Sequence, residues 1–202
     1  MNIASFRTTL IPLICLSLLG ACSSSDRANT EGILELQDGG TFTIPTPGPE
    51  HAWLATRAGH WSIASKWRMA PDAPWVEWAA EEWAEVVAGG FWVVSKQLGT
   101  FNLIPFEGRS TNGYDQVRKI YVGSWVDNFG SSLTTFEGHR DPVSGDLITW
   151  SDMMDPGLGK TMRVKMVSRY VDADHTVFEM HMPNPAGDGQ FLSMVQEATR
   201  IP

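Results

Sequence analysis

The chain has 202 residues, of which 43% are hydrophobic, and a formal net charge of −8 at pH 7. This length is enough for one domain with a sizeable core. An acidic chain without a basic stripe argues against nucleic-acid binding and against a polybasic lipid-surface role.

Residues 1–21 are predicted to form a lipoprotein signal peptide. Arg7 is the only charged residue among the first 25, and the apolar run "LIPLICLSLLGA" follows it. That run has the length of a signal-peptide core and is too short to span a membrane. It ends in "LGAC", the pattern of a bacterial lipobox. We therefore predict cleavage before Cys22 and acylation of its thiol, the alternative being an ordinary secretory signal cut nearby.

An acylated Cys22 predicts a protein of the bacterial cell envelope that is attached to the membrane through its lipid. Several acyl chains anchor a protein firmly, whereas a single chain is marginal. Ser23 rather than Asp follows the cysteine, which favours the outer membrane, facing the periplasm. The other cysteine, Cys15, lies in the predicted signal peptide. The mature domain would then have neither a disulfide nor a reactive thiol.

Residues 22–48 are predicted to be a flexible tether. Their segments "SSSDRANTEG" and "TIPTPGPE" are rich in Ser, Gly and Pro and cannot bury a core. A short extended piece is expected at "ILEL". The compact domain is expected over residues 49–202, beginning with a short helix that runs into Gly59.

Alternating apolar and polar residues predict strands after that helix. Residues 60–69 are the first such stretch, and 119–127, 162–171 and 174–182 show the same period of two. One apolar face and one charged face are typical of an antiparallel sheet with one side in solvent. The first stretch has on its apolar face Trp61, Ile63, Trp67 and Met69.

The stretch 75–88, "WVEWAAEEWAEVVA", fits either a helix or a strand. Its alanines and glutamates favour a helix. Its Trp and Val residues, and the Gly89–Gly90 break before "FWVVSKQL", favour a hairpin. We predict a strand.

Turn motifs recur at short intervals through the rest of the chain, as in "RDPVSGD", "DMMDPGLGK" and "PNPAGDGQ". The pattern predicts an all-β domain of about nine or ten strands. Strands of this number joined in a meander favour a closed, antiparallel up-and-down barrel, because closure removes exposed sheet edges.

Four motifs resemble the bacterial domain of unknown function 1579. They are "HAWLATRAGHW", "VVAGGFWVV", "FEGRSTNGYDQVRKIYVGSWVD" and "TVFEMHMPNPAGDGQFLSMVQEATR". The resemblance covers roughly residues 49–200 and implies a calycin-like or lipocalin-like barrel with no settled activity. A looser similarity joins Gly59 and Trp61 to lipocalins, fatty-acid-binding proteins and haem-binding nitrobindins. Nitrobindins bind haem iron through a histidine near the C-terminus, and "MVQEATRIP" has none, which argues against haem.

The nine tryptophans bear on ligand binding, because pockets for small molecules are lined by aromatic side chains with a few polar groups. The alternative is a solid barrel in which the tryptophans only pack. With the resemblance, we favour a barrel that holds a ligand. Its expected lining residues are Trp61, Ile63, Trp67, Trp125, Phe178, Met180 and Met182.

No motif assigns a metal, a cofactor or a catalytic residue. The five histidines form no known ligand spacing, and His175 and His181 are too far apart on one strand to share a metal. Met180 and Met182 in "EMHMP" raise Cu(I) as a minor alternative, since thioethers suit that ion. The acids Asp141, Asp146, Asp152 and Asp155 are read as turn residues.

The sequence thus predicts a lipid-anchored envelope barrel that binds a small hydrophobic or amphipathic molecule. The alternative is a non-enzymatic structural or interaction lipoprotein with a packed barrel and exposed tryptophans at a partner surface. A metal- or haem-binding envelope protein is a weaker third hypothesis.

Overall fold

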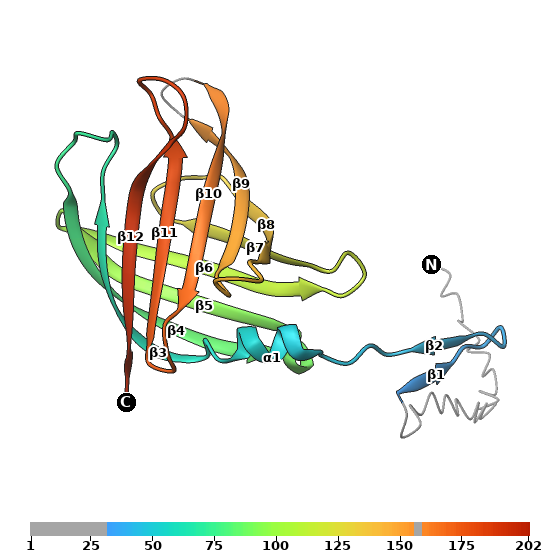
Figure 1. Cartoon of the computed structure of the whole chain (residues 1–202). Coiled ribbons are helices and arrows are strands. Elements are labelled where there is room, and N and C mark those ends of the chain that lie inside the picture. Colours follow the sequence, from blue (N-terminus) through green and yellow to red (C-terminus); the bar gives the residue numbers. More distant parts are fainter. Residues whose placement is uncertain (1–31, 156–158) are drawn as a thin grey trace, which may run out of the picture. The chain divides into compact units, whose positions relative to one another are not determined.

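The computed structural model describes residues 32–155 and 159–202 (Figure 1). The chain divides into two units, residues 1–45 and 46–202. The predicted signal peptide and Cys22 lie outside the described residues. In the described part of the first unit, β1 (Ile33–Glu35) pairs with β2 (Thr41–Thr43), so a hairpin lies within the segment expected to be a tether.

The second unit is a closed barrel of ten antiparallel strands preceded by the short helix α1 (Pro49–Ala55). Each strand pairs with the next along the chain, and β12 pairs with β3 to close the barrel. This confirms the predicted up-and-down topology. The strands are β3 (Gly59–Trp67), β4 (Val76–Val87), β5 (Trp92–Phe101), β6 (Ile104–Asp115), β7 (Ile120–Asp127), β8 (Thr134–Arg140), β9 (Leu147–Asp155), β10 (Lys160–Tyr170), β11 (His175–Pro183) and β12 (Gln190–Ile201), with the 3-10 turn η1 (Ala88–Gly90) between β4 and β5.

The ambiguous stretch 75–88 forms β4, as predicted. It pairs with β3 along one edge and with β5 along the other. These two ladders outweigh the helix propensity of its alanines and glutamates, because tertiary context overrides propensity. The small residue Ala80 also lets β5 approach closely. A Cβ at the opposing Gly99 would lie 2.8 Å from that of Ala80.

An up-and-down barrel has two ends, which we call the base and the mouth. The base holds α1, the C-terminus and the turns 88–91, 116–119, 141–146 and 171–174. The mouth holds the connections 68–75, 102–103, 128–133 and 184–189. Figure 1 shows α1 at the bottom of the barrel and the β3–β4 and β11–β12 loops at its top.

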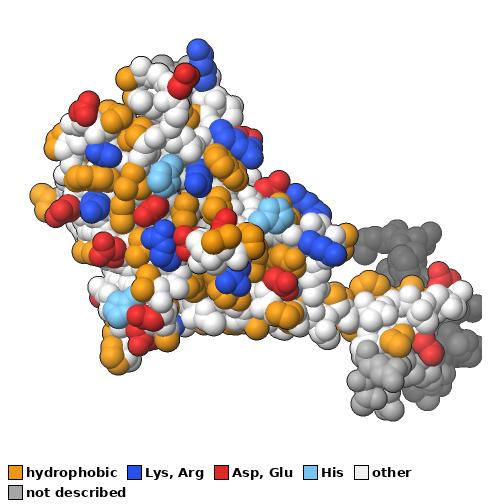
Figure 2. Space-filling view, in the orientation of Figure 1, with side chains coloured by type: hydrophobic (Ala, Val, Ile, Leu, Met, Phe, Trp, Pro, Cys, Tyr) orange, Lys and Arg blue, Asp and Glu red, His pale blue; other side chains and the backbone are white. Residues whose placement is uncertain are grey.

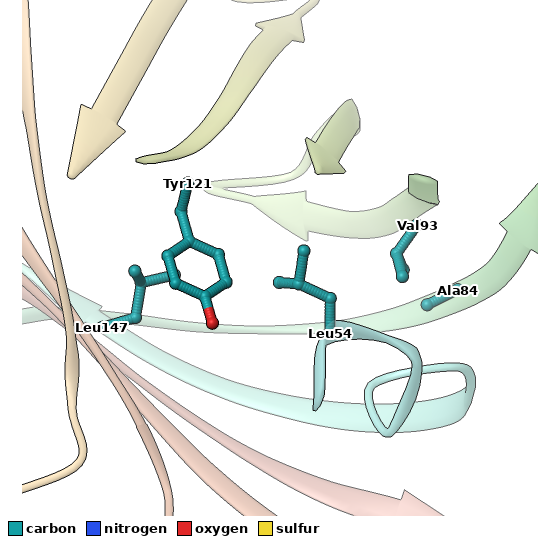
Figure 3. Close-up of a cluster of buried hydrophobic side chains, with 5 residues drawn as sticks. All are labelled: Leu54, Ala84, Val93, Tyr121 and Leu147. Carbon is teal, nitrogen blue, oxygen red and sulfur yellow. The ribbon is translucent and has the colours of Figure 1, made fainter. Parts of the chain in front are cut away.

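Helix α1 closes the base by inserting Leu54 among buried side chains of the barrel wall. Trp53 and Tyr114 pack around this cluster. The base is therefore filled with apolar side chains. Figure 3 shows the cluster, which consists of Leu54, Ala84, Val93, Tyr121 and Leu147.

His51 ties α1 to the barrel wall. Its Nδ1 accepts a hydrogen bond from the Gly48 N–H at 3.0 Å. Its Nε2 therefore carries the proton and donates to the Tyr114 carbonyl, also at 3.0 Å. The ring is buried and meets Phe91 edge-on at 5.1 Å. This histidine is a structural, hydrogen-bonded residue.

The Gly59–Trp61 pair has a specific packing role at the base. Trp61 is 1% exposed, and the guanidinium groups of Arg57 and Arg200 each lie 4.1 Å from its ring centroid. Arg200 also donates to the Ala58 carbonyl at 2.7 Å. A Cβ at Gly59, whose φ is +136°, would lie 2.2 Å from Arg200 Nη1. Glycine is thus needed for both its backbone angle and the close approach of the arginine.

Asp141 organises the β8–β9 turn at the base. Its Oδ1 accepts hydrogen bonds from the N–H groups of Ser144, at 2.8 Å, and Val143, at 2.9 Å. These bonds favour the ionised carboxylate and hold the pKa of Asp141 below its usual value of 3.8. Asp141 is thus a turn residue, in keeping with its sequence interpretation.

We expect Asp141→Asn to lower the urea midpoint of unfolding at neutral pH. The folded pKa is below the unfolded one, so the carboxylate stabilises the fold above the usual pKa and this contribution is lost as the pH falls through the lowered pKa. The difference between parent and variant should therefore narrow as the pH falls below about 4. Urea titrations over that range measure it, and a constant difference would contradict the assignment.

Candidate functional site

The pairing register identifies the inner face of the barrel, because residues directly opposite each other share a face. Ile63 lies opposite Ala80 on one side and Ala198 on the other, and all three are buried in one cluster. Following this register around the barrel places all seven residues predicted from the sequence on the inner face. They are Trp61, Ile63, Trp67, Trp125, Phe178, Met180 and Met182.

One half of the inner face is rich in methionine. Met166, Met180 and Met194 lie side by side on β10, β11 and β12, and Trp67 of β3 continues the row. The sequence does not show this row, because the register between strands cannot be read from one strand at a time. Flexible, polarisable thioethers adapt to irregular apolar shapes, so this wall suits an apolar molecule.

The other half of the inner face is aromatic toward the mouth. Trp78 meets Phe106 at 4.8 Å between ring centroids, and Phe106 meets Phe129 at 5.3 Å. Trp125 joins this group, and its indole Nε1–H donates to Asp127 Oδ2 at 2.8 Å. An apolar molecule between the two halves would contact methionine on one side and aromatic rings on the other.

The inner face is not completely packed. Phe136, Phe178, Met180 and Gln196 point inward from the middle parts of their strands, yet each keeps part of its surface exposed. In a solid barrel, inward side chains at such positions would be fully buried. The interior therefore retains accessible apolar surface beyond the filled base.

A carboxylate also faces inward, which the sequence interpretation did not identify. Glu82 lies opposite Trp61 and Gln97, and its Oε1 is 3.2 Å from Arg57 Nη2. Burial raises the pKa of Glu82, while Arg57 and a hydrogen bond from Ser95 act in the opposite direction. The sequence signal that could have identified Glu82 is the period of two along the strand. In that pattern Glu82 lies on the same face as Ala80.

Three buried polar atoms have no hydrogen-bond partner among the described residues. They are Arg57 Nη1, Ser65 Oγ and Gln97 Nε2. Ser65 and Gln97 are on the inner face by register. Because buried polar groups normally have partners, such atoms favour a hydrogen-bonding group within the barrel. They add polar positions to an otherwise apolar interior.

Three histidines on the barrel strands each pair with a single acid. The pairs are His60 with Glu81 at 2.8 Å, His175 with Asp172 at 2.9 Å and His181 with Glu179 at 3.2 Å. Within residues 32–155 and 159–202, no group of three or more His, Cys, Asp or Glu side chains is placed to hold a metal ion.

Figure 2 shows one face of the barrel, where acidic, basic and hydrophobic side chains are intermixed rather than sorted into a basic stripe. Among the described residues, the single helix of the barrel unit is far too short to cross a membrane, and no other helix there could do so.

Two solved structures show the same fold. Rv2717c from M. tuberculosis aligns with a TM-score of 0.56 and 12% identity, covering 77% of this chain and 99% of that chain. The S-type phycobiliprotein lyase CPES from Guillardia theta aligns with a TM-score of 0.53 and 11% identity, covering 76% of this chain and 93% of that chain. At these identities the likeness concerns the fold alone.

Of two sequence comparisons, one finds a match, and this match covers the barrel unit. No curated protein sequence matches the chain. The profile of a family described as "Protein of unknown function (DUF1579)" matches residues 46–200, which is nearly the whole barrel unit. The chain therefore belongs to the DUF1579 family, whose function is unknown, and its family domain forms a closed ten-stranded antiparallel barrel.

Proposed function

We propose that the barrel binds a small hydrophobic or amphipathic molecule against its inner face. The observation that carries this proposal is the partial exposure of inward apolar side chains such as Phe178 and Met180. Apolar surface that stays accessible inside a folded barrel gains free energy when a ligand covers it.

The composition of the inner face supports a ligand with a large apolar part and a small polar part. Methionine and aromatic side chains form the walls, and a few polar groups fix orientation, as in many small-molecule sites. The Arg57–Glu82 ion pair and the amide of Gln97 are the polar groups near the base. A polar head would lie toward the base, with the apolar part toward the mouth.

A ligand titration followed by tryptophan fluorescence tests the proposal. Trp61, Trp67, Trp78 and Trp125 lie on the inner face, so a ligand there should change the emission saturably. The panel should include fatty acids, haem and neutral aromatic compounds. If the emission stays unchanged throughout the panel, the proposal that the barrel binds a ligand is wrong.

That negative outcome would favour the alternative, an interaction protein with a structural barrel. Its specific support is a pair of outward tryptophans, Trp83 on β4 and Trp92 on β5, which remain exposed. Exposed aromatic rings are common at partner surfaces.

We also propose that acylated Cys22 anchors the protein in the bacterial envelope, facing the periplasm from the outer membrane. The lipobox pattern "LGAC" supports this. In the native host, Cys22→Ser should move the protein from the membrane fraction to the soluble fraction. The matched variant Cys15→Ser should leave it membrane-bound. Continued attachment of Cys22→Ser would refute lipid anchoring.

A further inference from the structure

Exposed apolar side chains line part of the mouth of the barrel. Each of three mouth loops contributes at least one of them, and we call this set the rim. The β9–β10 connection lies partly outside the described residues and is not counted. The rim consists of Met69 in the β3–β4 loop, Leu103 in the β5–β6 turn, and Phe129 and Leu133 in the β7–β8 loop.

Leu103 breaks a rule of local structure. Phe101 pairs with Ile104, so Asn102 and Leu103 form a two-residue hairpin turn, with φ of 47° and 68°. Such turns favour Asn-Gly, because a side chain in the left-handed region is strained. Leu103 is 94% exposed, so no packing in the folded barrel compensates for the strain. Departures from local rules without a folded-state gain are typical of functional or strained sites, so Leu103 is a candidate for a functional role.

Two of the mouth loops lack charge, although the β3–β4 loop contains Arg68 and Asp72 and the β11–β12 loop contains Asp188. The loops 102–103 and 128–133 contain no charged residue. Arg68, at the start of the β3–β4 loop, donates a hydrogen bond from Nε to the Leu192 carbonyl at 2.9 Å. Its guanidinium carbon lies 4.4 Å from the centroid of the Trp75 ring. At the base, Val117 is as exposed as Leu103 but sits beside charged residues, Asp115 and Arg118 among them.

We propose that the rim inserts into the surface of an electrically neutral lipid bilayer. Apolar and aromatic side chains on uncharged loops favour the interface between lipid headgroups and acyl chains. The chain is acidic overall, so anionic lipids repel it, and the two uncharged mouth loops, which carry Leu103, Phe129 and Leu133, suit a zwitterionic surface. Insertion places the mouth against lipid. Exchange of a ligand between the bilayer and the barrel additionally rests on the ligand binding proposed for the barrel.

Site-specific labels on the full chain test which end meets lipid. Two proteins are made in a Cys15→Ser, Cys22→Ser background, and each carries one bimane label. One label is at Ser132→Cys, in the β7–β8 loop beside the rim residue Leu133, and the other is at Val117→Cys at the base. The probe surface is phosphatidylcholine vesicles, with and without a doxyl-labelled lipid that quenches bimane. Any attachment through the N-terminal segment is the same in both proteins. The label at Ser132 should shift its emission to the blue and lose intensity with the quencher, and the label at Val117 should not.

Three outcomes would overturn the proposal. One is no quenching at Ser132, and another is equal quenching at Ser132 and Val117. The third is a blue shift of the Ser132 label that occurs without vesicles and grows with protein concentration. That result would assign the rim to contact with a second copy of the chain. Because no ligand is present, none of these outcomes bears on whether the barrel binds one, which the fluorescence titration without lipid decides.

A substitution at Leu103 separates insertion from folding. Leu103→Gly relieves the strained turn, so it should raise the melting temperature while reducing quenching of the Ser132 label. The matched variant Val117→Gly at the base should leave quenching unchanged. Undiminished quenching in Leu103→Gly would remove Leu103 from the insertion surface.

Discussion

Replacing Trp61 by alanine should lower the free energy of unfolding by about 3–5 kcal/mol, the usual cost of removing a large buried aromatic side chain. The ring is almost fully buried between the guanidinium groups of Arg57 and Arg200. Its Nε1–H donates to the Arg57 carbonyl at 2.9 Å. The substitution thus removes core packing, two cation–π contacts and a hydrogen bond from β3 to the segment that joins α1 to β3. Urea unfolding followed by far-UV circular dichroism measures the loss.

Trp83→Ala is the matched control on the neighbouring strand. Trp83 is 42% exposed and stacks on His60 at 4.6 Å on the outer face of the barrel. Its removal should cost less than about 1 kcal/mol, as for surface residues in general. Equal losses for the two variants would contradict the role of Trp61 as a buried packing residue at the base.

Met180→Trp should weaken ligand binding by about tenfold or more, which corresponds to about 1.4 kcal/mol. Met180 points into the partly open interior, between Met166 and Met194. An indole there would occupy space that the ligand needs. Titration of the ligand found with the parent protein measures the change in Kd. An unchanged Kd would show that the ligand binds elsewhere.

The matched control for Met180→Trp is Val177→Trp on the same strand. Val177 lies opposite Arg169 and Glu197 on the outer face, so an indole there should leave Kd unchanged. Stability separates a hollow barrel from a solid one. Overpacking a filled core costs about 1–3 kcal/mol. A loss of that size in Met180→Trp but not in Val177→Trp would show that the interior is filled, contrary to the proposal.

The sequence carries most of the information on the barrel's strands and faces. Alternation over "MRVKMVSRY" places Met162, Val164 and Met166 on one face, and the structure directs that face inward. The Gly59–Trp61 pair marks the start of β3 because Arg200 contacts both positions. Its guanidinium lies over the Trp61 ring and passes so close to residue 59 that a Cβ there would clash. Local patterns suffice where a residue's role depends on its own strand.

Features that depend on register between strands could not be predicted. The methionine row exists because β10, β11 and β12 align Met166, Met180 and Met194, and a shift of one residue would turn a side chain to the other face. The inward position of Glu82 was hidden by the choice between helix and strand for its segment. The composition of the segment 22–48 predicts a tether with one short extended piece at "ILEL", which forms β1, whereas its pairing with β2 is not indicated.

Mass spectrometry of the protein purified from its native host, first under native and then under denaturing conditions, tests the central claim most directly. We expect a noncovalent adduct that denaturation releases as a small lipophilic molecule, and we expect Met180→Trp to carry much less of it. It would be contradicted by parent protein that carries no adduct and takes up none from a lipid extract of the same host.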